Sequence, residues 1–227
     1  MVRLLTGVLL ILSMQISNAV GSDKPTDNFA TIGTNIDFKV FLNDREVGSH
    51  SFILQQQGEK LLVSSTMSLD FTVLMFKKIK YRHQANEVWE AGCLRSLNSQ
   101  TQKQGKNISV SAITDATGLV VEHKDGSQTI QGCARGFAYW DPRLLDADYL
   151  LNAESGQYLP VEISSTVSAQ DNITHMLIAG SKVDVRLQYD AAGNWLSLES
   201  KLQIGGLLRY QRVATDPLSS EPLLTGE

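Results

Sequence analysis

The segment around His83 carries the residue types that acid–base chemistry or anion binding requires. In the alternating pattern of a strand, Tyr81 and His83 share one face, and Arg82 lies on the other. The fork-shaped guanidinium of Arg82 suits a carboxylate or phosphate head group. His83 could serve as a general base, with Glu87 or Asp141 orienting its ring. The alternative is that Arg82 and His83 hydrogen-bond across strands or face solvent, and the frequency of polar pairs in sheets favours it.

Three aromatic residues, Phe137, Tyr139 and Trp140, form a second candidate site. As a lid or rim, they would stack on a ligand that enters a concave sheet. As a plug, they would close the core, with Tyr139 and Trp140 hydrogen-bonded to partners. The two interpretations are compatible, because a plug can also form one wall of a pocket.

Motifs of several established chemistries are absent from the sequence. It contains no G-x-S-x-G, S-x-x-K, H-E-x-x-H, P-loop or G-x-G-x-x-G motif. His50, His123 and His175 are flanked by residues typical of solvent-exposed positions, so we expect them at the surface. The two cysteines and four histidines lack the close spacing of zinc ligands. We therefore expect neither a bound metal nor a cofactor.

The first 19 residues have the pattern of a secretory signal peptide. Arg3 supplies positive charge, Leu4–Ile16 is almost wholly apolar, and Ser17–Ala19 offers the small residues that a signal peptidase reads. The apolar run is shorter than the roughly 20 residues that cross a bilayer, which disfavours a membrane anchor. We expect cleavage after Ala19. The rest of the chain then divides into a linker (20–30), a single β domain (31–214) and a disordered tail (215–227).

Export to an oxidising compartment makes a disulfide the simplest state of Cys93 and Cys133. No C-x-x-C motif occurs, which disfavours a redox pair. The bond would close a loop of about 40 residues and stabilise the fold by roughly 3–4 kcal/mol in the chain-entropy model.

The composition argues against several broad classes of protein. The 227 residues are 42% hydrophobic and 19% charged, with a net charge of −4. Such a chain is too apolar to be disordered and too polar to cross a membrane many times. Its acidic balance argues against a nucleic-acid partner. We expect a monomer.

Hydrophobic residues alternate with a period of two along most of the domain, which predicts an all-β fold. Turn pairs such as Asn43-Asp44 and Ala91-Gly92 separate the strands, as in an antiparallel meander. Twelve segments show this pattern, from which we estimate about eleven strands. They lie within Ile36–Leu42, Val47–Gln57, Leu61–Val73, Lys77–Trp89, Leu94–Thr101, Ile108–Ile113, Leu119–His123, Val161–Val167, Ile173–Ile178, Val183–Tyr189, Trp195–Ser200 and Leu207–Ala214.

A sheet of this size has one apolar face that must be covered. Only one short helix is predicted, near 142–147, where Asp141 and Pro142 give a helix start signal. We therefore predict a large curved antiparallel meander that closes as a barrel or half-barrel around an apolar concavity.

The apolar run Val73–Phe76 precedes Lys77, Lys78 and Lys80. This pattern fits either transient contact with an anionic membrane surface or a strand that is buried on both faces and then emerges into solvent. A single patch on an acidic protein favours the buried strand.

Several motifs together resemble an uncharacterised family of secreted bacterial all-β proteins. The motifs are Tyr81–Gln84, Trp89–Leu94, Gly132-Cys133, Phe137–Pro142, Leu150–Ala153 and Tyr189–Leu196. The resemblance covers essentially the whole mature domain and implies a Gram-negative envelope location, so we expect a periplasmic protein. The shape is similar to that of the half-barrel lipoprotein carriers, as an analogy of fold alone.

These observations favour a periplasmic binding or carrier protein for an apolar or amphiphilic ligand related to lipids. Its pocket would be lined by Arg82, His83, Phe137, Tyr139 and Trp140. Two alternatives stay open. One is a hydrolase-like or lipid-modifying enzyme that uses His83, and the other is an envelope scaffold that pairs with a partner through a sheet edge.

Overall fold

The computed structural model describes residues 33–73, 77–143, 147–202 and 205–214. Fifteen strands occur in these residues. They are β1 (Thr34–Leu42), β2 (Arg45–Gln57), β3 (Lys60–Val73), β4 (Lys77–Glu90), β5 (Cys93–Lys103), β6 (Lys106–Asp115), β7 (Gly118–His123), β8 (Gly126–Ile130), β9 (Tyr149–Leu151), β10 (Tyr158–Pro160), β11 (Glu162–Val167), β12 (Thr174–Gly180), β13 (Val183–Tyr189), β14 (Trp195–Lys201) and β15 (Leu207–Arg212).

Alternation along each strand separates two faces of the sheet. On β3, Leu61, Val63 and Met67 are buried, whereas Ser64 and Thr66 are exposed. Successive side chains of a strand point to opposite faces, so a period of two in the sequence becomes one apolar and one polar face. We call the face that carries Met67 the inner face and the face that carries Ser64 the outer face.

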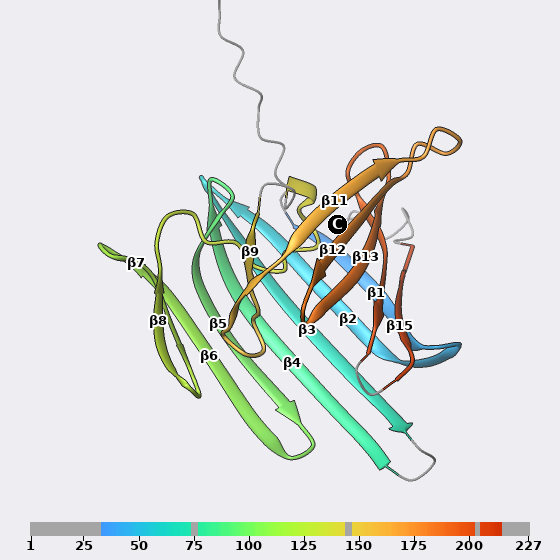
Figure 1. Cartoon of the computed structure of the whole chain (residues 1–227), viewed down its shortest axis with the longest axis horizontal. Helices are drawn as coiled ribbons and strands as arrows, with labels where there is room; N and C mark the ends of the chain where they lie inside the picture. Colours follow the sequence, from blue (N-terminus) through green and yellow to red (C-terminus); the bar gives the residue numbers. More distant parts are fainter. Residues whose placement is uncertain (1–32, 74–76, 144–146, 203–204, 215–227) are drawn as a thin grey trace, which may run out of the picture.

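Thirteen strands form one antiparallel sheet, in the order β11-β12-β13-β14-β15-β1-β2-β3-β4-β5-β6-β7-β8 (Figure 1). The pairing of β1 with β15 joins the two ends of the domain and places Val40 opposite Tyr210. Every other neighbouring pair is consecutive in the sequence, so the predicted antiparallel meander is confirmed. The sheet does not close as we predicted, because β8 and β11 remain as its two edges.

The sheet nevertheless curls strongly around its inner face. Phe52 on β2 and Trp195 on β14 are three strands apart, which would separate their backbones by about 14 Å in a flat sheet. Their ring centroids are 5.5 Å apart, and those of Phe38 and Trp195 are 4.2 Å apart. The curl therefore brings distant strands together around one aromatic core.

Residues 131–161, which we call the connection, link β8 to β11 and contain the hairpin of β9 and β10. The predicted disulfide between Cys93 and Cys133 is confirmed, with a Cα–Cα distance of 5.0 Å. Beside it, the Leu94 N–H donates to the Ala134 carbonyl at 2.9 Å. Leu150 and Leu151 are fully buried, and β9 lies in front of the long strands β3–β5 in Figure 1. The connection therefore fills part of the space that the curled sheet would enclose.

Among the described residues, the predicted short helix near 142–147 is not seen. Pro142 and Arg143 form a single 3₁₀ turn, in which the Arg143 N–H donates to the Asp141 carboxylate at 3.0 Å. This contact is the capping interaction that the helix start signal at Asp141 predicts. Residues 144–146 lie outside the described residues.

Three strands were not predicted, namely β8, β9 and β10. The first is polar and rich in small residues, and the other two have only three residues each, so none shows a measurable period of two. The apolar run that begins at Val73 continues through 74–76, outside the described residues, so neither the favoured buried strand nor the alternative membrane contact is tested.

Candidate functional site

The aromatic segment of the connection packs into the core. The Tyr139 ring lies 5.6 Å from that of Trp195 and 6.0 Å from that of Phe137. The Tyr189 hydroxyl donates to the Tyr139 carbonyl at 2.6 Å. Trp140 meets Trp89 edge-on at 5.4 Å. This packing is that of a plug, and burial accordingly raises the pKa of the Tyr139 hydroxyl above its ordinary value.

Arg82 lies on the outer face, away from this plug. Its guanidinium donates to the carbonyls of Leu69 and Tyr81, each at 2.9 Å, and approaches Asp70 at 3.5 Å. Period-two alternation therefore separates Arg82 from its neighbour His83. The two predicted ligand-binding residues do not share a surface.

His83 is buried on the inner face of β4, where its Nδ1 lies 2.8 Å from the Thr101 hydroxyl. Burial lowers the pKa of the His83 imidazole, and the Glu154 carboxylate partly opposes that shift. Glu154 comes from the connection. It accepts a hydrogen bond from the Tyr81 hydroxyl at 3.0 Å and pairs with Lys103 at 3.3 Å. The connection is thus fastened to the sheet beside His83.

The carboxylates that we predicted as partners of His83 have other partners. Glu87 accepts a hydrogen bond from the Trp89 indole at 2.7 Å, and it lies about 13 Å along the strand from His83. Asp141 binds the guanidinium of Arg143 at 2.8 Å. The structure does not bring Glu87, Asp141 and His83 together as one acid–base unit.

His50 is buried, although we expected it at the surface. Its neighbours Ser49 and Ser51 suggested solvent, but in a strand adjacent residues face the opposite side. His50 Nδ1 lies 3.1 Å from the Tyr210 hydroxyl, and that hydroxyl donates to the Met67 sulfur at 3.6 Å. His50 Nε2 is buried and has no hydrogen-bond partner among the described residues. Burial, with a smaller effect of His83, lowers the pKa of His50 to about 3.

A groove of about 650 Å³ crosses the outer face from β2 to β7. One row of its lining is largely aliphatic and the adjacent row carries hydroxyl and amide groups. The largely aliphatic row consists of Gln55, Leu62, Val88, Ser96, Ile113 and Val120, and the polar row consists of Ser64, Asn86, Asn98, Ser111 and Glu122. Ile113 is 67% exposed, and the Ser64 hydroxyl donates to Asn86 at 2.8 Å. We call this feature the outer groove. Sequence reasoning missed it because it placed the pocket in the apolar concavity of the sheet.

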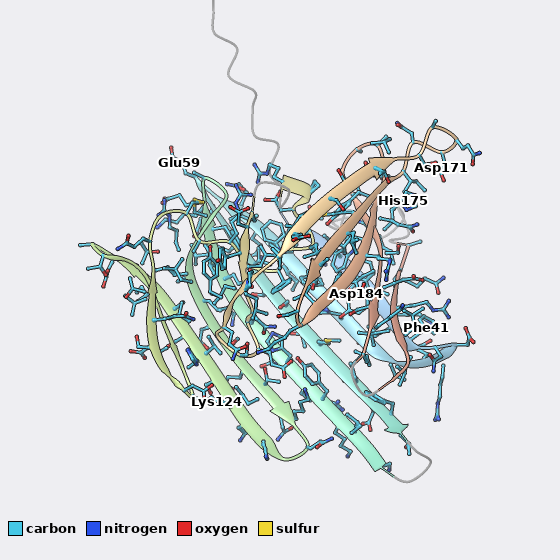
Figure 2. The ribbon with its side chains drawn as sticks, in the orientation of Figure 1. Phe41, Glu59, Lys124, Asp171, His175 and Asp184 are labelled. Carbon is cyan, nitrogen blue, oxygen red and sulfur yellow. A yellow bond between two sulfur atoms is a disulfide. The ribbon has the colours of Figure 1, made fainter. Side chains whose placement is uncertain are left out.

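A second hollow, of about 600 Å³, lies over β11–β15 and includes Phe41 and His175, both labelled in Figure 2. Its two arginines already have acidic partners. Arg186 pairs with Asp184 at 2.9 Å, and Arg209 pairs with Asp44 at 2.7 Å. These ion pairs leave the hollow poorly suited to an anionic ligand.

Within residues 33–73, 77–143, 147–202 and 205–214, no group of three or more His, Cys, Asp or Glu side chains is arranged to hold a metal ion. In the same described part of the chain, no helix has the length and apolar character needed to span a bilayer.

The curled sheet, its buried connection and the disulfide define a barrel-like, all-β domain. The chain belongs to the family described as Domain of unknown function (DUF6134), whose profile matches residues 38–213. The resemblance to an uncharacterised all-β family is thereby confirmed. The sequence matches no curated protein.

One solved structure has a similar fold. It is the crystal structure of a beta-barrel-like protein of domain of unknown function DUF1849 from Brucella abortus. The TM-score is 0.54 at 9% sequence identity, and the match covers 80% of this chain and 96% of that one. At this identity the similarity concerns the fold alone.

Proposed function

We propose that this protein is a non-enzymatic periplasmic binding or carrier protein for an amphiphilic, lipid-related ligand. The outer groove is the observation that carries this proposal. Its volume of about 650 Å³ falls within the range of small-molecule sites. An aliphatic row such as Leu62, Val88 and Ile113 suits an acyl chain, while the adjacent amides and hydroxyls suit a polar head group.

The plug supports an outer site over an interior one. Phe137, Tyr139 and Trp140 already pack against core aromatics, and Leu150 and Leu151 are fully buried. An acyl chain in the interior would have to displace this packing. The outer groove needs no such rearrangement.

The charges of the groove indicate the kind of head group. On the outer face its acidic side chain is Glu122, and neither lysine nor arginine lines the groove. A carboxylate or phosphate would therefore meet like charge without a cationic partner. The preferred ligand is an uncharged amphiphile whose hydroxyl or ester groups hydrogen-bond to Asn86 and Asn98.

The periplasmic location rests on the predicted signal peptide and is supported by the disulfide between Cys93 and Cys133. Structural disulfides persist in oxidising compartments such as the periplasm.

Binding of a neutral monoacylglycerol and of the fatty acid with the same chain, measured by native mass spectrometry, tests this function. We expect the neutral probe to bind more tightly. Ile113→Asp should weaken its binding about tenfold, because a charge in the aliphatic row costs at least about 1.4 kcal/mol. Val167→Asp is the matched control, since Val167 is 62% exposed but lies on β11, outside the groove. No binding of either probe, or equal losses in the two variants, would contradict the proposal.

A further inference from the structure

The inner face carries a row of three side chains whose donor atoms suit a soft metal ion. His50 on β2 is directly opposite Met67 on β3, and Met67 is directly opposite His83 on β4. Residues in such a cross-strand row share one face of the sheet. We call these three residues the His-Met-His row.

Side chains on this face can bridge a distance of two strands. His50 and Tyr210 are two strands apart, yet their ring centroids are 5.6 Å apart because the sheet curls toward its inner face. His50 and His83 have the same separation in the sheet, with Met67 between them. An ion bound by all three side chains would lie above Met67, between the two imidazoles.

Hydrogen bonds at Nδ1 prepare both histidines as ligands through Nε2. The Tyr210 hydroxyl contacts both Met67 and His50, and we assign its single proton to Met67, which places the proton of the His50–Tyr210 bond on His50 Nδ1. His50 Nε2 is then a bare lone pair, buried without a donor. His83 Nδ1 is held by Thr101, and no hydrogen bond to its Nε2 occurs among the described residues. Anchoring one ring nitrogen to orient the other is how proteins prepare histidine as a metal ligand.

The donor atoms of the His-Met-His row determine which kind of metal ion the row would bind. Two neutral imidazoles and a thioether contain no anionic ligand, so burying a divalent ion here would leave its charge uncompensated. A thioether favours Cu(I), and imidazole also binds copper well. A monovalent, soft ion matches both the charge and the softness of the row.

We propose that His50, Met67 and His83 bind one Cu(I) ion through the two imidazole Nε2 atoms and the thioether sulfur. This site lies on the inner face, so it is independent of the amphiphile binding proposed for the outer groove. Either proposal can fail while the other holds.

Titration of the purified full chain with Cu(I), in competition with a chromogenic Cu(I) chelator, tests the site. We expect one equivalent to bind, with a sulfur ligand visible by X-ray absorption. Met67→Leu should weaken binding by at least about tenfold and remove the sulfur signal. The matched control is Met176→Leu, which changes another buried methionine of the inner face, on β12, and should leave both readouts unchanged.

A second pair of variants covers the case in which Met67→Leu does not fold. His50→Phe should abolish the one-equivalent binding, whereas His175→Ala, at an exposed position on β12, should not. The proposal is overturned if no stoichiometric Cu(I) binds. It is also overturned if Met67→Leu binds like Met176→Leu, or if only His175→Ala reduces binding.

Discussion

Glu87 is a carboxyl group on the inner side of β4, in register with the buried Val63 and Leu97. Burial raises the pKa of Glu87 to about 7, although the hydrogen bond from Trp89 opposes the shift. The folded state therefore holds this proton more tightly than the unfolded state does. Stability that depends on the neutral carboxyl is fully present below about pH 4.5 and is lost as the pH rises toward 7.

Glu87→Gln should remove this dependence, because an amide does not ionise. For the wild type, we expect the free energy of unfolding to fall by up to about 3 kcal/mol between pH 4.5 and pH 7.5 relative to this variant. Urea unfolding across that range measures the difference. Glu122→Gln, at an exposed position of β7, is the control and should keep the wild-type slope. Parallel pH profiles for wild type and Glu87→Gln would contradict the assignment.

His50 and Arg82 show which features of single residues can be predicted from the sequence and which cannot. Alternation correctly placed Arg82 and His83 on opposite faces, since that depends only on the strand period. The burial of His50 was not predicted, because its flanking serines say nothing about the face that His50 itself occupies. The Tyr210–His50 contact joins residues 160 positions apart and follows from the sheet order alone.

At the scale of elements, one close approach between β2 and β3 fixes their pairing. A Cβ on Gly48 would lie 1.9 Å from the Ser68 carbonyl oxygen, and Gly48 has a φ of 151°. The position sits beside the register shift of β1 at Val40 and Phe41. Only glycine lets the strands approach this closely.

Gly48→Ala should therefore destabilise the domain by about 2 kcal/mol or more, since backbone atoms must move. Gly126→Ala is the matched control, because Gly126 also has positive φ, at 130°, but a Cβ there meets nothing within 4 Å. We expect the control to lose only the part that the positive φ causes, and therefore to cost less than Gly48→Ala. Thermal and urea unfolding of the two variants measure the difference. Equal losses of stability in the two variants would contradict this explanation. They would mean that the positive φ of Gly48, and not the close approach of β3, makes alanine unfavourable at position 48.

The connection is the element that the disulfide holds. Replacing both Cys93 and Cys133 by serine should lower the free energy of unfolding by about 4 kcal/mol in the chain-entropy model, given their separation of 40 residues. Increased proteolysis within 131–161 should accompany the loss, with β1–β4 remaining protected. Unchanged stability in the double variant would show that packing of Leu150 and Leu151 alone holds the connection.

Element types were largely predictable, whereas the connection was not. Long strands such as β3 and β4 were predictable from the alternation of apolar and polar residues. Their ends were predictable from turn pairs such as Ala91-Gly92, where both residues have positive φ. β9 and β10 are held by the Leu151–Arg135 hydrogen bond and by burial of leucines, which are tertiary contacts without a local period.

At the scale of the whole molecule, the decisive feature is that the interior is packed and the amphiphilic surface lies outside. Strand number predicted curvature, and curvature predicted a concavity, but the sequence does not say what fills a concavity. The connection supplies that filling. The twist of the same sheet leaves the outer groove, with Ile113 and Asn98 on neighbouring rows. We propose that an amphiphile binds in that groove, and the proposed function depends on this claim.

Photo-cross-linking with a diazirine-labelled monoacylglycerol, followed by peptide mapping, tests this claim most directly. We expect labelled peptides from β3, β4, β6 and β7 around Leu62, Val88, Ile113 and Val120, with labelling reduced by Ile113→Asp and retained in Val167→Asp. Labelling concentrated in the connection at 131–161, or spread without preference over β11–β15, would contradict it.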